Sequence, residues 1–215
     1  MKAKIIVLFS SMLVLLTGCL VVSIHPFYTD EDVIYKPELT GKWIDHDSGT
    51  WIITQHMEFG GIFKPDRPGN SYEIKFTDNK GTSEFIAHLF QLGKEMYLDF
   101  YPGNREKGND LENFHFVPSH SLARIEFKNG QIIIGWYNQE WLIGLFNKNK
   151  IRIAHERTPY DIDDKNQDHY EVVLTASTKD LQKFILKYGN DPNAFKKDTT
   201  NNFFNSDYTL ILSRK

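Results

Sequence analysis

SYEIKFTDNKGTSEFIAHLFQLGKEMYLDFY, residues 71–101, contains most of the information about the fold. Apolar and polar residues alternate in it with a period of two, as in a β-strand with one buried face. Turn residues interrupt the alternation at 78–81 and again at 91–94. The stretch therefore predicts three antiparallel strands, and their apolar faces are Tyr72, Ile74 and Phe76, then Phe85, Ala87 and Leu89, then Met96, Leu98 and Phe100.

The same pattern continues on both sides of this stretch. It predicts further strands at 50–55, 113–117, 121–127, 131–137, 151–156, 171–176 and 208–212. Lys128-Asn129-Gly130 is a strong hairpin signal between two of these strands. Two segments follow a helical period instead, 139–147 and 177–188, and the second has Ser177 as its cap and Gly189 at its end.

These elements define the expected fold class. The chain is mainly β, a β-rich α+β protein with an antiparallel meander sheet or a barrel. It has two short helices, and the second precedes the last strand.

The N-terminus has the composition of an export signal. Lys2 and Lys4 precede an apolar run at 5–16, and small residues follow it. A run of this length is shorter than the roughly 20 residues that cross a bilayer as a helix. We therefore expect residues 1–18 to be a signal peptide rather than part of the fold.

The end of that signal resembles the lipobox of bacterial lipoproteins, Leu16-Thr17-Gly18-Cys19. The resemblance implies cleavage before Cys19 and lipidation of Cys19 with acyl chains such as palmitate, so that the partner of the domain is a membrane. Leu20 stands where an Asp retains such proteins at the inner membrane of enteric bacteria, which implies the outer membrane if the cell has two membranes.

Three segments follow from this interpretation: the signal at 1–18, a lipidated Cys and tether at 19–38, and a single β-rich domain at 39–215. Apolar side chains such as Phe27 and Ile34 make us expect the 20–38 segment to lie along the domain. Loss of Lys2 and Lys4 leaves 23 basic against 28 acidic residues, a net charge of −5. This charge balance gives no indication of nucleic-acid binding. Cys19 is the single Cys, so no disulfide stabilises the domain.

A second resemblance concerns the domain itself. Gly41-Lys42-Trp43 at the first strand, antiparallel strands, a helix and a last strand are similar to the lipocalin and calycin plan. The resemblance implies an eight-stranded barrel in which Trp43 plugs one end and Arg214 packs across it. The Thr-Asp-Tyr loop of that family is not present at 118–121, and the helix at 139–147 is an additional element.

Aromatic residues are abundant, with sixteen Phe, ten Tyr and four Trp. One interpretation is an apolar cavity that binds a lipid or another hydrophobic small molecule, lined by Tyr72, Phe85, Leu98 and Phe114. The alternative is an envelope structural or interaction lipoprotein with a filled core and no ligand. With a filled core, one face of such a strand is expected to pack the core, and the other face, which carries Tyr97 and Tyr101, is expected to lie under a helix.

Signals for catalysis are sparse. The sequence has no His-Glu-x-x-His, no Gly-x-Ser-x-Gly and no phosphate-binding loop, so we expect no enzyme, no cofactor and no bound metal. An enzyme would instead require His115, His120 or His155 to meet a carboxylate in a pocket. A metal would require His115 and His120 to share it with Asp110 or Glu112. The simpler interpretation of His155-Glu156 is an ion pair or a capped strand.

Overall fold

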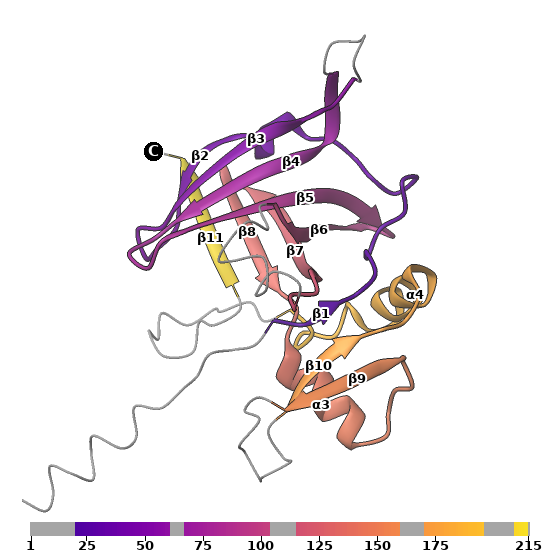
Figure 1. Cartoon of the computed structure of the whole chain (residues 1–215). Coiled ribbons are helices and arrows are strands. Elements are labelled where there is room, and N and C mark those ends of the chain that lie inside the picture. Colours follow the sequence, from indigo (N-terminus) through magenta and orange to yellow (C-terminus); the bar gives the residue numbers. More distant parts are fainter. Residues whose placement is uncertain (1–19, 61–66, 104–114, 160–169, 196–208, 215) are drawn as a thin grey trace, which may run out of the picture.

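A computed structural model describes residues 20–60, 67–103, 115–159, 170–195 and 209–214. Its centre is a closed antiparallel barrel of eight strands (Figure 1). The pairing of β6 with β7 closes the barrel. The eight strands are β2 (Gly41–Ile44), β3 (Thr50–Glu58), β4 (Arg67–Thr77), β5 (Thr82–Leu92), β6 (Glu95–Pro102), β7 (His120–Lys128), β8 (Gln131–Trp136) and β11 (Thr209–Arg214). The expected mainly-β class is confirmed, and of the two expected architectures the structure has the barrel.

The alternation of apolar and polar residues in 71–101 determines which side chains point into the barrel. Its inward side chains form one core, in which Leu89 and Leu98 face each other across β5 and β6. Small residues lie beside large ones, since Ala87 pairs with Phe100 and Ala123 pairs with Trp136. Such alternation lets side chains fill a narrow barrel.

Two expected strands differ from the observed ones. No strand is present at 115–117, the described part of the strand expected at 113–117. The strand expected at 151–156 is instead β9 (His155–Pro159). Its partner β10 (Tyr170–Leu174) pairs its last residue with His155 and then leads to the cap of the next helix. Among the described residues no strand pairs with 151–154, although the Thr175 N–H donates to the Ala154 carbonyl (3.0 Å).

A second layer covers the outer face of β5, β6 and β7. It contains β1 (Val22–Ser23), β9, β10 and the helices α3 (Gln139–Asn147) and α4 (Thr178–Tyr188) (Figure 1). β1 joins the two layers, because it pairs with β7 on one side and with β10 on the other. The core between the layers contains Tyr97 together with Phe184 of α4, as expected, whereas the Tyr101 ring contacts His120 (4.7 Å between ring centres). None of the described helices has the length and apolar character needed to cross a bilayer.

Residues 20–40, which we call the strap, run along the barrel from β1 to the 3-10 helix η1 (Pro37–Leu39), as Figure 1 shows. Val21 and Phe27 are buried, and the Ile34 N–H donates a hydrogen bond to the Leu89 carbonyl (2.8 Å). The expectation that this segment lies along the domain is confirmed. The strap is therefore part of the packed structure and contributes to both cores.

Candidate functional site

One end of the barrel is closed by the strap. Trp43 Nε1 donates to the Leu39 carbonyl (3.0 Å), and the Arg214 guanidinium lies 4.8 Å from the centre of the Trp43 ring. Arg214 also donates to the Glu38 carbonyl (3.3 Å). The expected packing of Arg214 across Trp43 is confirmed. Leu39 is fully buried beneath this cover, so the closed end is sealed by side chains.

The middle of the barrel is filled. Tyr72, Ala87, Leu89, Leu98 and Ala123 have no exposed surface. The Tyr72 hydroxyl accepts from the Lys36 N–H (2.7 Å), which ties the strap to the barrel interior. Burial raises the pKa of Tyr72 to about 12, so its hydroxyl stays protonated at neutral pH. A cavity large enough for a water molecule would leave part of an adjoining side chain accessible. Because these five residues have no accessible surface, no such cavity borders them.

Aromatic side chains gather at the opposite end, near the turns at 45–49 and 78–81. Ring centres are 4.6 Å apart for Trp51 and Phe76, 5.9 Å for Phe85 and Phe100, and 4.9 Å for Phe100 and Trp136. Phe76, Phe85 and Trp136 are only half-buried. We call these five residues the aromatic mouth. They form an apolar surface that an apolar molecule can contact without opening the filled middle.

The residues expected to line a ligand cavity lie in different places. Tyr72 and Leu98 are in the filled middle, whereas Phe85 is in the aromatic mouth. Phe114 lies outside the described residues. Sequence reasoning did not single out Trp51 and Trp136 for this role. Their positions could have indicated this role. Each is an inward-facing residue near the end of its strand, and both strand ends lie at the same end of the barrel.

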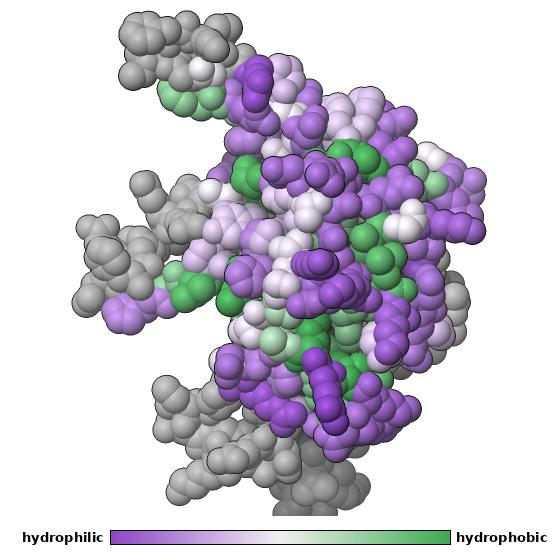
Figure 2. Space-filling model, turned by 90° about the vertical axis from the view of Figure 1, so that its right-hand side faces the viewer, coloured by the Kyte–Doolittle hydropathy of each residue, from purple (hydrophilic) through white to green (hydrophobic). Residues whose placement is uncertain are grey.

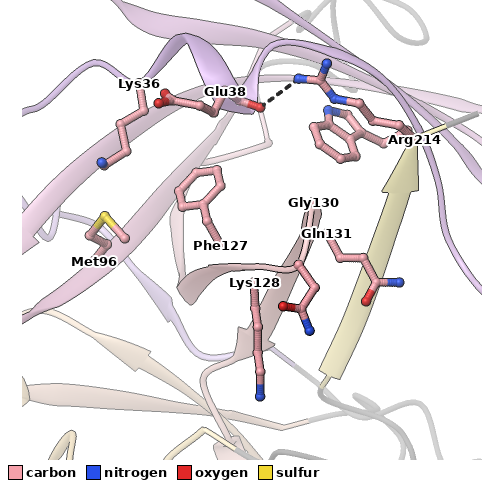
Figure 3. Close-up of a pocket in the computed structure, with 10 residues that line it drawn as sticks. Lys36, Glu38, Met96, Phe127, Lys128, Gly130, Gln131 and Arg214 are labelled. Carbon is pink, nitrogen blue, oxygen red and sulfur yellow. Dashed lines mark hydrogen bonds between the residues drawn. The ribbon is translucent and has the colours of Figure 1, made fainter.

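A pocket of about 580 Å³ lies outside the closed end, between η1 and the β7–β8 turn (Figure 3). In Figure 3 the Phe127 ring lies at its centre, with Lys36 and Glu38 on one side and Lys128 on the other. We call it the basic pocket. Its lining residues are Lys36, Glu38, Trp43, Met96, Phe127, Lys128, Asn129, Gly130, Gln131 and Arg214.

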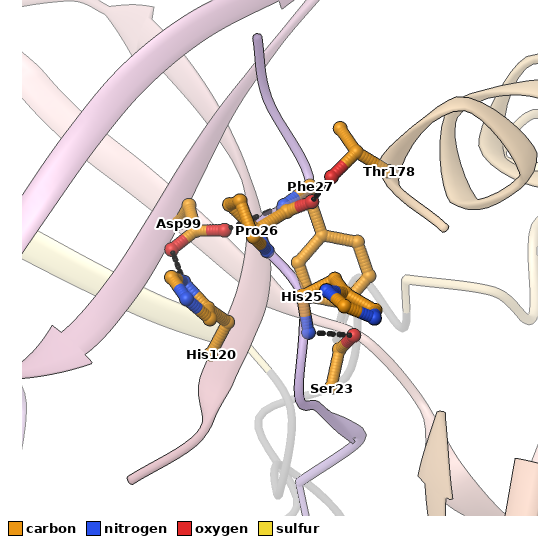
Figure 4. Close-up of polar contacts among 7 residues, drawn as sticks. All are labelled: Ser23, His25, Pro26, Phe27, Asp99, His120 and Thr178. Atoms are coloured by element: carbon orange, nitrogen blue, oxygen red, sulfur yellow. Dashed lines mark hydrogen bonds and ion pairs between the residues drawn. The ribbon is translucent and has the colours of Figure 1, made fainter. Parts of the chain in front are cut away.

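A polar cluster joins the strap to the outer wall of the barrel (Figure 4). Asp99 has no exposed surface; its Oδ2 accepts from the Phe27 N–H (2.8 Å) and its Oδ1 lies 2.7 Å from His120 Nδ1. Thr178 at the start of α4 donates to the Pro26 carbonyl (2.8 Å). Both Asp99 oxygens are thus used to hold the strap and β7, which is a structural role.

Two further histidines, His88 and His155, pack against aromatic rings. His88 stacks on Tyr28 (4.3 Å between ring centres), and its burial lowers its pKa and keeps the ring neutral. His155 stacks on Phe146 (3.7 Å), and its Nδ1 lies 2.9 Å from the Ile153 carbonyl.

The metal site considered around His115 and His120 is only partly within the described residues, because Asp110 and Glu112 lie outside them. Within the described ranges, no group of three or more His, Cys, Asp and Glu side chains is placed to hold a metal ion. His120 meets the carboxylate of Asp99 instead.

Comparisons with protein-family models, with curated proteins and with solved structures find no match to this chain. The function therefore has to be argued from the residues themselves.

Proposed function

We propose that this protein is an exported lipoprotein, held on a membrane by acyl chains on Cys19, whose barrel binds an apolar small molecule at the aromatic mouth. The basic start, short apolar run and Leu-Thr-Gly-Cys of residues 1–19 support the anchor. The proposed location is the outer membrane if the cell has two membranes. More than one acyl chain provides stable anchoring, because a single chain binds a bilayer only marginally.

Replacement of Cys19 by alanine is expected to abolish both lipid labelling and membrane association. The measurement is incorporation of labelled palmitate by the full chain expressed in a bacterium, followed by separation of membrane and soluble fractions. Ser11→Ala is the matched control, because it alters the apolar run and leaves residues 16–19 intact. A Cys19→Ala chain that still takes up label and sediments with membranes would contradict the proposed anchor.

The aromatic mouth is the observation that supports ligand binding. Its rings contact in two groups, Trp51 with Phe76 (4.6 Å) and Phe100 with both Phe85 (5.9 Å) and Trp136 (4.9 Å), yet Phe76, Phe85 and Trp136 remain half-buried. Leaving apolar surface in water costs about 25 cal/mol per Å², so covering these rings with an apolar ligand is favourable. The filled middle limits the ligand to the mouth, which favours a short apolar group over one that threads the barrel.

A charge placed in the mouth is expected to weaken binding of a fluorescent fatty-acid probe. Phe85→Asp should reduce the affinity about tenfold or more, equivalent to ~1.4 kcal/mol, because the carboxylate would lose water on binding. Ile211→Asp is the matched control, since Ile211 is 42% exposed. The protein is residues 19–215 with Cys19→Ser, and the measurement is energy transfer from tryptophan to the probe. Equal affinities for both variants would contradict a ligand site at the mouth.

The alternative is a structural or interaction lipoprotein without a ligand. The filled middle favours it, because Tyr72, Leu89 and Leu98 leave no space for a ligand among them. In the face shown in Figure 2 the apolar residues form separate islands among polar ones. Native mass spectrometry with lipid extraction separates the two proposals. A stoichiometric apolar ligand in the purified protein supports ligand binding. An empty protein that takes up no fluorescent probe supports the alternative, and cross-linking would then identify its protein partners.

A further inference from the structure

The basic pocket combines positive charge with an apolar wall. Lys36, Lys128 and Arg214 contribute three cations, and Glu38 contributes one carboxylate. In the part of the chain that the structure describes, no carboxylate forms an ion pair with any of the three. This local excess of positive charge contrasts with the net charge of −5 that the chain has without residues 1–18.

Two of these cations, Arg214 and Lys36, contact neutral groups. Arg214 donates to the backbone carbonyls of Glu38 (3.3 Å) and Thr40 (3.5 Å) and lies over the Trp43 ring. Lys36 Nζ lies 5.9 Å from the centre of the Phe127 ring. Carbonyls and rings attract a cation but do not neutralise it, so an oxyanion entering the pocket gains charge-assisted hydrogen bonds.

The apolar part of the wall comes from Phe127, Met96 and Trp43. In Figure 3 Lys36 lies beside Met96 and Phe127, whereas the Lys128 side chain points away from the Phe127 ring. A volume of about 580 Å³ is within the range of roughly 300–1,000 Å³ that small-molecule sites have. A bare ion would use only the charged rim of such a pocket. A ligand that also has an apolar part would cover Phe127 and Met96 as well.

We propose that the basic pocket binds an amphiphile with an oxyanion head group, a phosphate or a carboxylate, whose apolar part packs on Phe127. This site is at the opposite end of the barrel from the aromatic mouth and does not depend on ligand binding there. A lipid head region and a soluble phosphomonoester share this chemistry.

The test uses residues 19–215 with Cys19→Ser, which retain every residue of both cores. Isothermal titration with octyl phosphate is expected to show binding. Replacing Lys36 and Lys128 together by glutamine should lower the affinity about tenfold or more. Lys80→Gln is the matched control, because Lys80 is an exposed lysine in the turn at the other end of the barrel, and it should leave the affinity unchanged. Glu38→Gln should strengthen binding, since Glu38 is the one carboxylate among the described residues that line the pocket.

Two further ligands test whether binding requires both the anionic head group and the apolar tail. Octyl glucoside, which has the same tail and no charge, should bind at least tenfold more weakly, as should inorganic phosphate. Equal binding of octyl glucoside would overturn the proposal of an anion site, and equal binding of inorganic phosphate would overturn the proposal that the ligand is an amphiphile.

NMR maps the position of the bound octyl phosphate. Amide shifts should occur at Gly130 and Gln131 and should persist in the Phe85→Asp protein. Shifts confined to the aromatic mouth would overturn the assignment to the basic pocket. A vesicle carrying phosphatidic acid tests the lipid source, and glycerol phosphate tests the soluble one.

Discussion

The Phe27→Ala protein is expected to unfold with a free energy about 3–5 kcal/mol lower than that of the natural protein. Phe27 has no exposed surface and packs in the core between the barrel and the second layer. Its truncation removes buried apolar area and leaves a cavity between the strap and the core, which the surrounding side chains can fill only in part. Urea unfolding followed by tryptophan fluorescence measures the change.

Phe59→Ala is the matched control for this prediction. It makes the same chemical change at a side chain that is 79% exposed, so its effect should stay within about 0.5 kcal/mol. If both variants are as stable as the natural protein, the strap is not a structural part of the domain. If both are strongly destabilised, the effect does not come from burial of Phe27.

Removal of the Asp99 carboxylate is the second large expected effect. Asp99→Ala leaves the Phe27 N–H and His120 without their acceptor in a buried place, which should cost about 3 kcal/mol. Asp99→Asn should cost less, because the amide oxygen can still accept from the Phe27 N–H while the amide NH₂ can donate to His120 Nδ1 in the tautomer that has its proton on Nε2. The strap should also become accessible, so limited proteolysis is expected to cut the Ala variant within residues 20–40 first.

Asp47→Ala serves as the control, since the Asp47 side chain is 72% exposed. Its unfolding free energy and its proteolytic pattern should match those of the natural protein. An Asp99→Ala protein with an uncut strap and unchanged stability would show that the two hydrogen bonds contribute nothing net.

The barrel strands were predictable because their signals are local. Alternation fixes which side chains point inward, and Gly81, Gly93 and Gly130 mark turns in which each adopts a positive φ. Closure was not predictable from local signals. It depends on the pairing of Leu98 with Ala123. A long connection separates these two strands, and the sequence indicated a further strand within it, at 113–117.

The sites were less predictable than the strands. Phe85 was expected in a ligand site and lies in the aromatic mouth, but its neighbours there come from other strands, and the stagger of the closed barrel decides which rings meet. Asp99 stands on the outward face of β6 and resembles a surface residue in the sequence. Its partner Phe27 is 72 residues away, so only the folded chain shows that it is buried.

The strap leaves almost no flexible linker between the folded domain and the proposed lipid anchor at Cys19. Leu20 already forms a bridge to Asn138, and Val21 is buried, whereas Cys19 is the next residue toward the N-terminus. One residue spans at most about 3.6 Å, so a lipid on Cys19 would hold the domain against the head groups. Such a protein could not reach across a cell envelope or turn freely above its membrane. A ligand held in the leaflet on which the protein stands would be within reach of the domain.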